Sequence, residues 1–238
     1  MPFRKLVLLF AAVSVLGCGE EDLPTGVLPT GPTGRFRVVN AVSDPTRANR
    51  VNITVDGTPV RVDVAYGQAG PATLYYPALA GDRQLRMVQT SSQAVLVDEA
   101  ITIEADQDVT VIAVGATGPI ETVIITDDNT APAAGSVKIR GVNAALSSAG
   151  AVDVYVTATA ADVATATPVA TAVAVNEAGA YATVPAGVHR VTFTSTGTKT
   201  VVGAVTLPTL ASGAVRTVLL LDAAAGGTPL ATATLTDR

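Results

Sequence analysis

The chain is short of the residues on which most active sites depend. Its 238 residues include one cysteine, one histidine and no tryptophan. A single cysteine excludes a disulfide within the chain. The lone His189 leaves the usual nucleophilic and transition-metal sites without the partners they need, and we expect it to be a surface strand residue. We therefore predict a protein that is not an enzyme and that holds no cofactor.

Charge is also scarce. Charged residues make up 15% of the chain, against about a quarter in an average protein. The 15 basic and 20 acidic residues give a net charge of −5, and without a basic cluster this disfavours nucleic-acid binding. Aromatic residues reach only 4%, whereas hydrophobic residues reach 48%. Abundant valine and threonine suit strands better than helices, so valine, isoleucine, leucine and alanine must fill the core.

The N-terminal segment has the features of a secretory signal peptide. Arg4 and Lys5 precede the apolar run Leu6–Val15, which is too short to span a bilayer comfortably. Cys18 follows the small residue Gly17 at the end of this segment, which resembles a bacterial lipobox. We expect removal of residues 1–17 and lipidation of Cys18; an ordinary signal peptide with a chance cysteine is the alternative.

Residues 18–33 predict a flexible tether between the lipid and the folded part. They are rich in proline, glycine and threonine and show no apolar period. Gly19 after the cysteine resembles the pattern of lipoproteins sent on to the outer membrane in cells with two membranes. The expected location is the cell envelope, lipid-anchored in the outer membrane, on its periplasmic or its exposed face.

A duplication organises the remaining chain. RVVNA at 37–41 recurs as RGVNA at 140–144, the alternating strand Val51–Asp56 recurs at Val152–Thr157, and a Thr-Asp pair ends both copies. Short strands separated by turns predict an all-β protein of two tandem Ig-like or transthyretin-like antiparallel β-sandwiches. We place repeat 1 at residues 34–127, a linker at 128–135 and repeat 2 at 136–238. Because the linker has no apolar strand, we expect each repeat to fold independently around its own core.

Three local features qualify this pattern. Ser43–Pro45 is a turn signal, and Pro77 is expected to end a strand ladder. The turn Pro185–Gly187 is matched with the turn between Pro77 and Gly81. The alanine-rich segment Thr159–Thr167, which precedes a proline, predicts a short helical turn.

These motifs resemble the bacterial "domain of unknown function 4397" repeats. The resemblance rests on RVVNA and RGVNA, and on AVDVYV, ADVATATPV, YATVPAG and GAVRTVLLLD. It covers about Gly34 to Arg238 and is stronger in repeat 2, since VNITV replaces VDVYV in repeat 1. The family occurs in secreted and surface-anchored proteins without an established activity. The resemblance thus implies a fold and a location and no catalytic residue.

Three tyrosines are the candidate binding residues. Strand phase places Tyr155 opposite the core side of its strand, and Tyr75 and Tyr181 share the outer phase. Exposed tyrosines can stack on sugars or anchor a protein contact. The alternative is that they pack across neighbouring strands.

One oxygen-rich segment is a weak calcium candidate. Asp127, Asp128 and Asn129 offer oxygen ligands that suit Ca²⁺, but their spacing matches no EF-hand loop. The simpler interpretation is a strand end and a linker turn.

The sequence therefore predicts a non-catalytic, lipid-anchored envelope protein with a binding, adhesive or structural role at the cell surface. Its partner would be an unknown surface protein or glycan, with no nucleic acid. The alternative is a carbohydrate-binding accessory protein or a hydrolase acting on envelope glycans, which would need an acidic cleft flanked by tyrosines.

Overall fold

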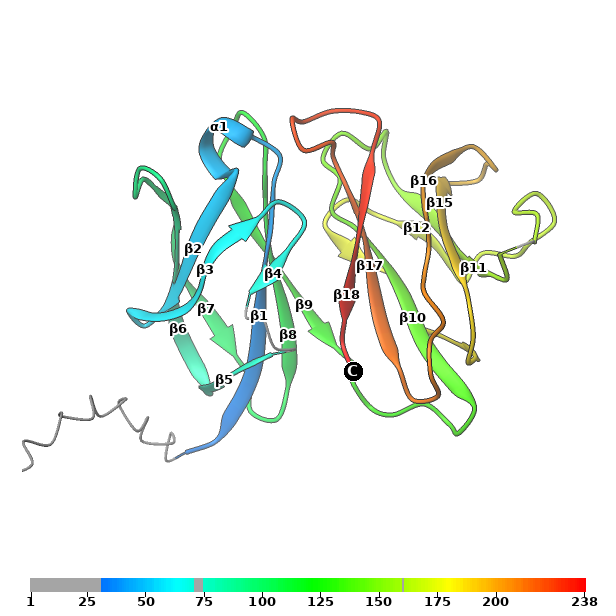
Figure 1. Ribbon diagram of the computed structural model, residues 1–238, viewed down its shortest axis with the longest axis horizontal. Helices are drawn as coiled ribbons and strands as arrows, with labels where there is room; N and C mark the ends of the chain where they lie inside the picture. Colours follow the sequence, from blue (N-terminus) through cyan, green and yellow to red (C-terminus); the bar gives the residue numbers. More distant parts are fainter. Residues whose placement is uncertain (1–30, 71–74, 160) are drawn as a thin grey trace, which may run out of the picture. The chain divides into compact units, whose positions relative to one another are not determined.

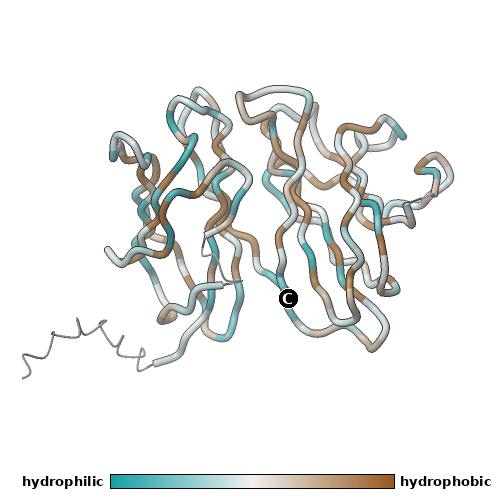
Figure 2. The backbone as a smooth tube through the Cα atoms, in the orientation of Figure 1, coloured by the Kyte–Doolittle hydropathy of each residue, from teal (hydrophilic) through white to brown (hydrophobic). Residues whose placement is uncertain are grey.

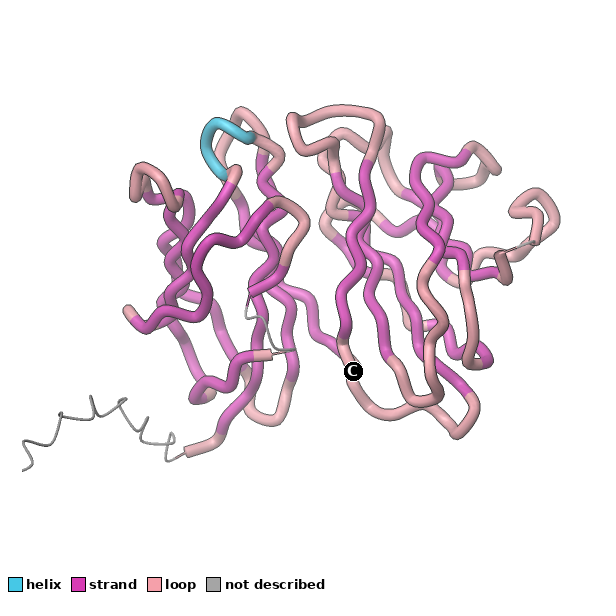
Figure 3. Tube along the Cα trace, in the orientation of Figure 1, coloured by secondary structure: helices cyan, strands magenta, loops and turns pink. Residues whose placement is uncertain are grey.

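Four β-sheets make up the part of the chain that the computed structural model describes, which is residues 31–70, 75–159 and 161–238 (Figures 1 and 3). Within these ranges one short helix, α1 (Pro45–Ala48), is present, and no helix is long and apolar enough to cross a membrane. The all-β prediction is confirmed. The signal peptide, Cys18 and most of the tether lie outside the described residues.

The strands of repeat 1, β1 to β9, form two sheets. Sheet B is an antiparallel sheet in the order β3 (Thr58–Ala65), β2 (Arg50–Val55), β6 (Gly81–Gln89) and β7 (Val95–Ile103). Sheet A has the order β4 (Ala69–Gly70), β1 (Thr33–Val42), β8 (Asp108–Gly115) and β9 (Glu121–Asp127), and β5 (Tyr76–Leu79) also pairs with β1.

Repeat 2 has the same topology. Sheet D has the order β12 (Ala170–Val173), β11 (Val152–Thr157), β15 (Arg190–Ser195) and β16 (Val201–Thr206). Sheet C has the order β13 (Glu177–Ala178), β10 (Ser136–Asn143), β17 (Val215–Leu221) and β18 (Ala231–Thr236), and β14 (Ala182–Pro185) also pairs with β10.

The predicted antiparallel sandwich arrangement is confirmed, with one exception at the centre of each of sheets A and C. Strand β1 runs parallel to β8, and β10 runs parallel to β17. Between the two strands of each pair the chain leaves to build the other sheet of its repeat. It therefore returns in the original direction, as a parallel pair requires.

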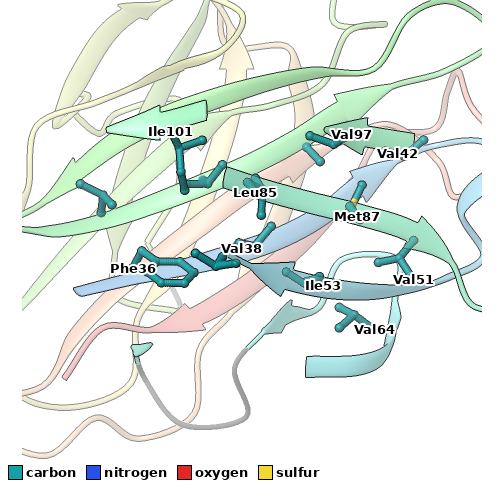
Figure 4. Close-up of a cluster of buried hydrophobic side chains, with 14 of the residues drawn as sticks. Phe36, Val38, Val42, Val51, Ile53, Val64, Leu85, Met87, Val97 and Ile101 are labelled. Atoms are coloured by element: carbon teal, nitrogen blue, oxygen red, sulfur yellow. The ribbon is translucent and has the colours of Figure 1, made fainter. Parts of the chain in front are cut away.

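Each repeat has its own core, as the sequence predicts. Phe36 and Val38 of β1 face sheet B, where they join Ile53, Leu85 and Met87 (Figure 4). The equivalent core between sheets C and D is formed around Phe193. Figure 2 shows apolar colouring concentrated in the strands, as expected where β-branched side chains fill the space between sheets.

A third apolar cluster joins the two repeats. The neighbours of the core residues point to the opposite sheet face, so Val39 and Ile112 of sheet A pack with Val142 and Leu219 of sheet C. Residues 31–238 accordingly form one compact unit. The linker contains no strand, as the sequence predicts, but the faces of sheets A and C make an apolar contact between the repeats that the sequence did not predict.

Three local predictions also need correction. Asp44 caps α1, with its carboxylate accepting from the Thr46 amide, so the expected turn at 43–45 begins a helix. Pro77 lies inside β5, opposite Arg35, where an edge strand tolerates the missing N–H. The register matches Pro185 with Leu79 and not with Pro77.

The alanine-rich segment after β11 forms no helix in its described residues. Thr165 and Ala166 donate to the carbonyls of Asp162 and Val163, three residues earlier, and the Asp162 carboxylate accepts from the Ala164 amide. These bonds make a tight turn, so the prediction of a short helical turn is wrong in its described residues.

Candidate functional site

The densest group of ionisable side chains lies where the two repeats meet. Arg37 and Arg140, on equivalent positions of β1 and β10, are 2% and 3% exposed. Asp127 and Asp237, at equivalent strand ends, are 6% and 2% exposed. We call these four residues, with Thr110, Thr217, Tyr75 and Tyr181, the interface network.

The network is reciprocal, since each arginine binds the end of the other repeat. Arg37 Nη2 lies 2.6 Å from Asp237 Oδ1, and Arg37 Nη1 donates to the Thr236 carbonyl at 2.9 Å. In the same way Arg140 Nη2 donates to Asp127 Oδ1, and Arg140 Nη1 donates to the carbonyl of residue 126 at 3.0 Å. The contact has the form of a two-fold isologous interface within one chain.

In repeat 1, Thr110 and Tyr75 complete the network. Thr110 lies on β8, opposite Arg37 in the parallel register, and its hydroxyl accepts from Arg37 Nε at 2.8 Å. The same hydroxyl and that of Tyr75 donate to Asp127 Oδ2, at 2.5 and 2.6 Å. The Arg37 guanidinium also lies 4.7 Å from the centre of the Tyr75 ring.

Repeat 2 reproduces these contacts with its own residues. Thr217 accepts from Arg140 Nε at 3.0 Å and donates to Asp237 Oδ2 at 2.7 Å. The Tyr181 hydroxyl lies 3.2 Å from the same oxygen, and its ring centre is 4.5 Å from the Arg140 guanidinium. Every charged group of the network therefore has hydrogen-bond partners inside the protein.

Burial determines the protonation behaviour of the network. It raises the pKa of the Tyr75 and Tyr181 hydroxyls above their usual value, so both remain neutral donors. Burial lowers the pKa of the Arg37 guanidinium, but the nearby carboxylates of Asp237 and Asp127 have the larger combined effect, so the pKa is raised. Burial likewise raises the pKa of Asp127, against the opposing effect of Arg140 and Arg37.

The predicted exposure of the tyrosines is wrong. Tyr75 is 7% exposed and Tyr181 is half-buried, because both point into the interface network. Tyr155 is 2% exposed, since Lys199 lies 4.5 Å over its ring. The Lys199 ammonium donates to the Tyr155 hydroxyl at 3.1 Å and to the Ala166 carbonyl at 2.7 Å, which draws the turn after β11 over this face.

The calcium candidates do not share a centre. Asp127 is engaged in the interface network, whereas Asp128 lies 2.7 Å from Lys138 Nζ. Asn129 donates to Asp108 at 2.6 Å. Hydrogen bonds from Lys138 and from residue 130 lower the pKa of Asp128 to about 2. The three side chains therefore act as capping and pairing groups, and the described residues contain no cluster of His, Cys, Asp or Glu with the geometry of a metal site.

Several shallow concavities in the described residues lie away from the network. One of about 440 Å³ includes His189 and Val188, and His189 Nε2 lies 2.7 Å from the Pro185 carbonyl oxygen. Another of about 340 Å³ lies beside α1 and is lined by Arg50 and Asp63, which form an ion pair. No tyrosine lines either of these two.

Sequence reasoning missed both arginines of the network and Asp237. The available signal was an arginine at the same place in two corresponding strands, in RVVNA and RGVNA, together with a Thr-Asp pair at the end of each repeat. A buried charge repeated in register indicates a partner that is repeated in register as well.

Comparison with known proteins gives a family and little else. A family model described as "Domain of unknown function (DUF4397)" matches residues 34–155. No curated protein matches the chain. Among solved structures, a leucine-rich repeat protein from Bacteroides thetaiotaomicron matches at 14% identity and a TM-score of 0.21, over 79% of this chain and 26% of that chain. At that TM-score the likeness carries no argument.

Proposed function

Since this chain belongs to the DUF4397 family of domains of unknown function, we propose that it is a lipid-anchored, non-catalytic protein of the cell envelope. Its role is to hold a rigid pair of β-sandwiches at the membrane surface for binding or for a structural contact. In this proposal the folded residues 34–238 make the contact, and the residues before them supply the lipid anchor and a tether that separates the folded part from the membrane.

One observation carries the non-catalytic part of this proposal. The four charged residues that the structure gathers most closely are nearly inaccessible and hydrogen-bonded to one another. Groups held in this way have their polar contacts already satisfied, so they stabilise the contact between repeats and do not face a substrate. We therefore assign the cluster a structural role in the contact between the repeats.

The N-terminal sequence supports the anchor. Cys18 follows the apolar run Leu6–Val15, and the segment Gly19–Thr33 is rich in proline and glycine. A stretch of this length reaches at most about 50 Å when extended. The proposed lipid on Cys18 would therefore leave the sandwiches free to stand clear of the bilayer surface.

The anchor is tested by metabolic labelling with an alkyne fatty acid in a bacterium that exports the full chain. The wild-type protein is expected to carry the label and to sediment with membranes. The Cys18→Ala variant is expected to lose the label and to remain as an unprocessed precursor, because lipidation precedes cleavage in the lipobox pattern.

Ser14→Ala provides the matched control, since it changes the same segment without removing the thiol. This variant should be labelled as the wild type is. A labelled Cys18→Ala protein, or an unlabelled wild-type protein that is still exported and cleaved, would overturn the anchor.

A further inference from the structure

Strand β1, the first strand of the folded unit, is not an edge strand. It pairs along one side with β5 and then with β4, and along the other side with β8. The parallel register with β8 runs without a shift from Arg35, opposite Asp108, to Val42, opposite Gly115. An edge strand such as β18 pairs only with β17 among the described strands. A force on the residues before β1 would therefore reach a strand that is held on both sides.

Both faces of β1 are buried as well. Phe36 and Val38 lie in the core between sheets A and B. Val39 and Ala41 lie in the cluster that the two repeats share. Because side chains in a protein interior interdigitate at close to crystal density, β1 cannot move along its own axis without disturbing both clusters.

Two arginine side chains link β1 to β8 near the end where the chain enters the fold. Arg35 Nε and Nη2 donate to the two carboxylate oxygens of Asp108, both at 2.6 Å, and this bidentate geometry is stronger and more specific than a single neutral hydrogen bond. Arg37 donates to the hydroxyl of Thr110 on the same strand. Each link joins residues that are opposite each other in the register, so sliding of β1 along β8 would break both.

The parallel pairing determines how a force acts on these contacts. Parallel strands start at the same end of a sheet, and the Asp106 amide, just before β8, donates to the Thr33 carbonyl at 2.9 Å. Residues 116–120, which follow β8, lie at the opposite end (Figure 1). A force between Thr33 and residues 116–120 runs along both strands and acts on all the register pairs together. A force between Thr33 and residues 104–107 runs across the strands and separates the pairs one after another.

We propose that β1 and β8 form a mechanical clamp, which keeps repeat 1 folded when the N-terminal anchor is pulled away from a contact made at the opposite end of these strands. The proposal rests on the anchor and the contact role given above, and it adds the task of bearing force. A lipid-anchored protein that holds a partner is pulled whenever that partner moves relative to the membrane. The force then acts along β1, the direction in which the most contacts must break at once.

Single-molecule pulling on the full chain in two directions tests the clamp. When the chain is produced without export, Cys18, its only cysteine, keeps a free thiol and serves as one handle. Gly118→Cys supplies the second handle beyond the far end of β8, where an added Cβ would meet no atom within 4 Å. Ala105→Cys, in the exposed turn before β8, is the matched control. Urea denaturation checks that both variants fold as the wild type does, and the exposed Thr117→Cys replaces Gly118→Cys if that variant does not.

At one loading rate, the Gly118→Cys variant is expected to rupture at a several-fold higher force than the Ala105→Cys variant, because only in the former do the register pairs break together. Its rupture should lengthen the molecule by about 250–280 Å, the extended length of residues 34–118 less their separation in the fold. Equal forces in the two directions, or a lower force for Gly118→Cys, would overturn the proposal. These forces do not depend on lipidation, so failure of the anchor in the labelling experiment and failure of the clamp are distinguishable.

Discussion

At the scale of single residues, the interface network shows buried charged groups whose hydrogen-bonding atoms are paired inside the protein. Removing an arginine and an aspartate from water costs several kcal/mol, which the pair regains only with good geometry and complete hydrogen bonding. Arg140 meets this condition through Asp127, Thr217 and the carbonyl of residue 126. Its loss would leave Asp127 with fewer partners inside a site that water does not reach.

We therefore expect Arg140→Ala to lower the free energy of unfolding by about 3–5 kcal/mol. Arg50→Ala is the control, because Arg50 pairs with Asp63 on the surface and about half of each side chain is exposed. Its loss should cost no more than about 1 kcal/mol. Urea denaturation of both variants measures the difference, and equal losses would show that burial does not govern the network.

At the scale of elements, the two repeats fill equivalent positions between their sheets with side chains of different size. Gly141 of β10 occupies the position that Val38 holds in β1, and Phe193 occupies that of Met87. A Cβ on Gly141 would lie 2.8 Å from the Phe193 ring. The larger ring of repeat 2 is thus accommodated by the missing side chain beside it.

This compensation predicts a coupled pair of substitutions. Gly141→Val alone should destabilise the protein by about 1–3 kcal/mol through overpacking. Adding Phe193→Met relieves one of the two close contacts of a Cβ at this position, the other being with Val154, and should recover part of that loss. A double-mutant cycle by urea denaturation measures the coupling, and additive losses would mean that the two positions do not share one space.

Strand positions were predictable because β-branched residues alternate with polar ones in most strands. The burial of Tyr155 was not predictable in this way, since alternation assumes that the second face of a strand meets water. Here Lys199 and the turn that ends near Ala166, both outside β11, cover that face. The parallel pairing of β1 with β8 was not predicted from the sequence either, because the spacing of strands along the chain does not reveal which sheet each strand joins.

At the scale of the whole molecule, we expect the two repeats to fold as one unit, because residues 31–238 are compact and share an apolar cluster. Adjacent residues of the inner strands serve different cores, as Leu219 faces repeat 1 and Leu220 faces sheet D. Strands buried on both faces read as continuous apolar runs, as residues 218–221 (VLLL) do in β17. Independent folding of the repeats was inferred from the linker alone, and the linker does not make the contact.

Native-state hydrogen exchange on the Leu219→Ala variant tests this central claim most directly. The substitution removes a fully buried side chain from the shared cluster and should cost about 2–5 kcal/mol. If the repeats unfold as one unit, protected amides of β1 and β8 in repeat 1 will lose the same free energy of opening as those of β10 and β17 in repeat 2. A loss of protection confined to repeat 2 would contradict the account.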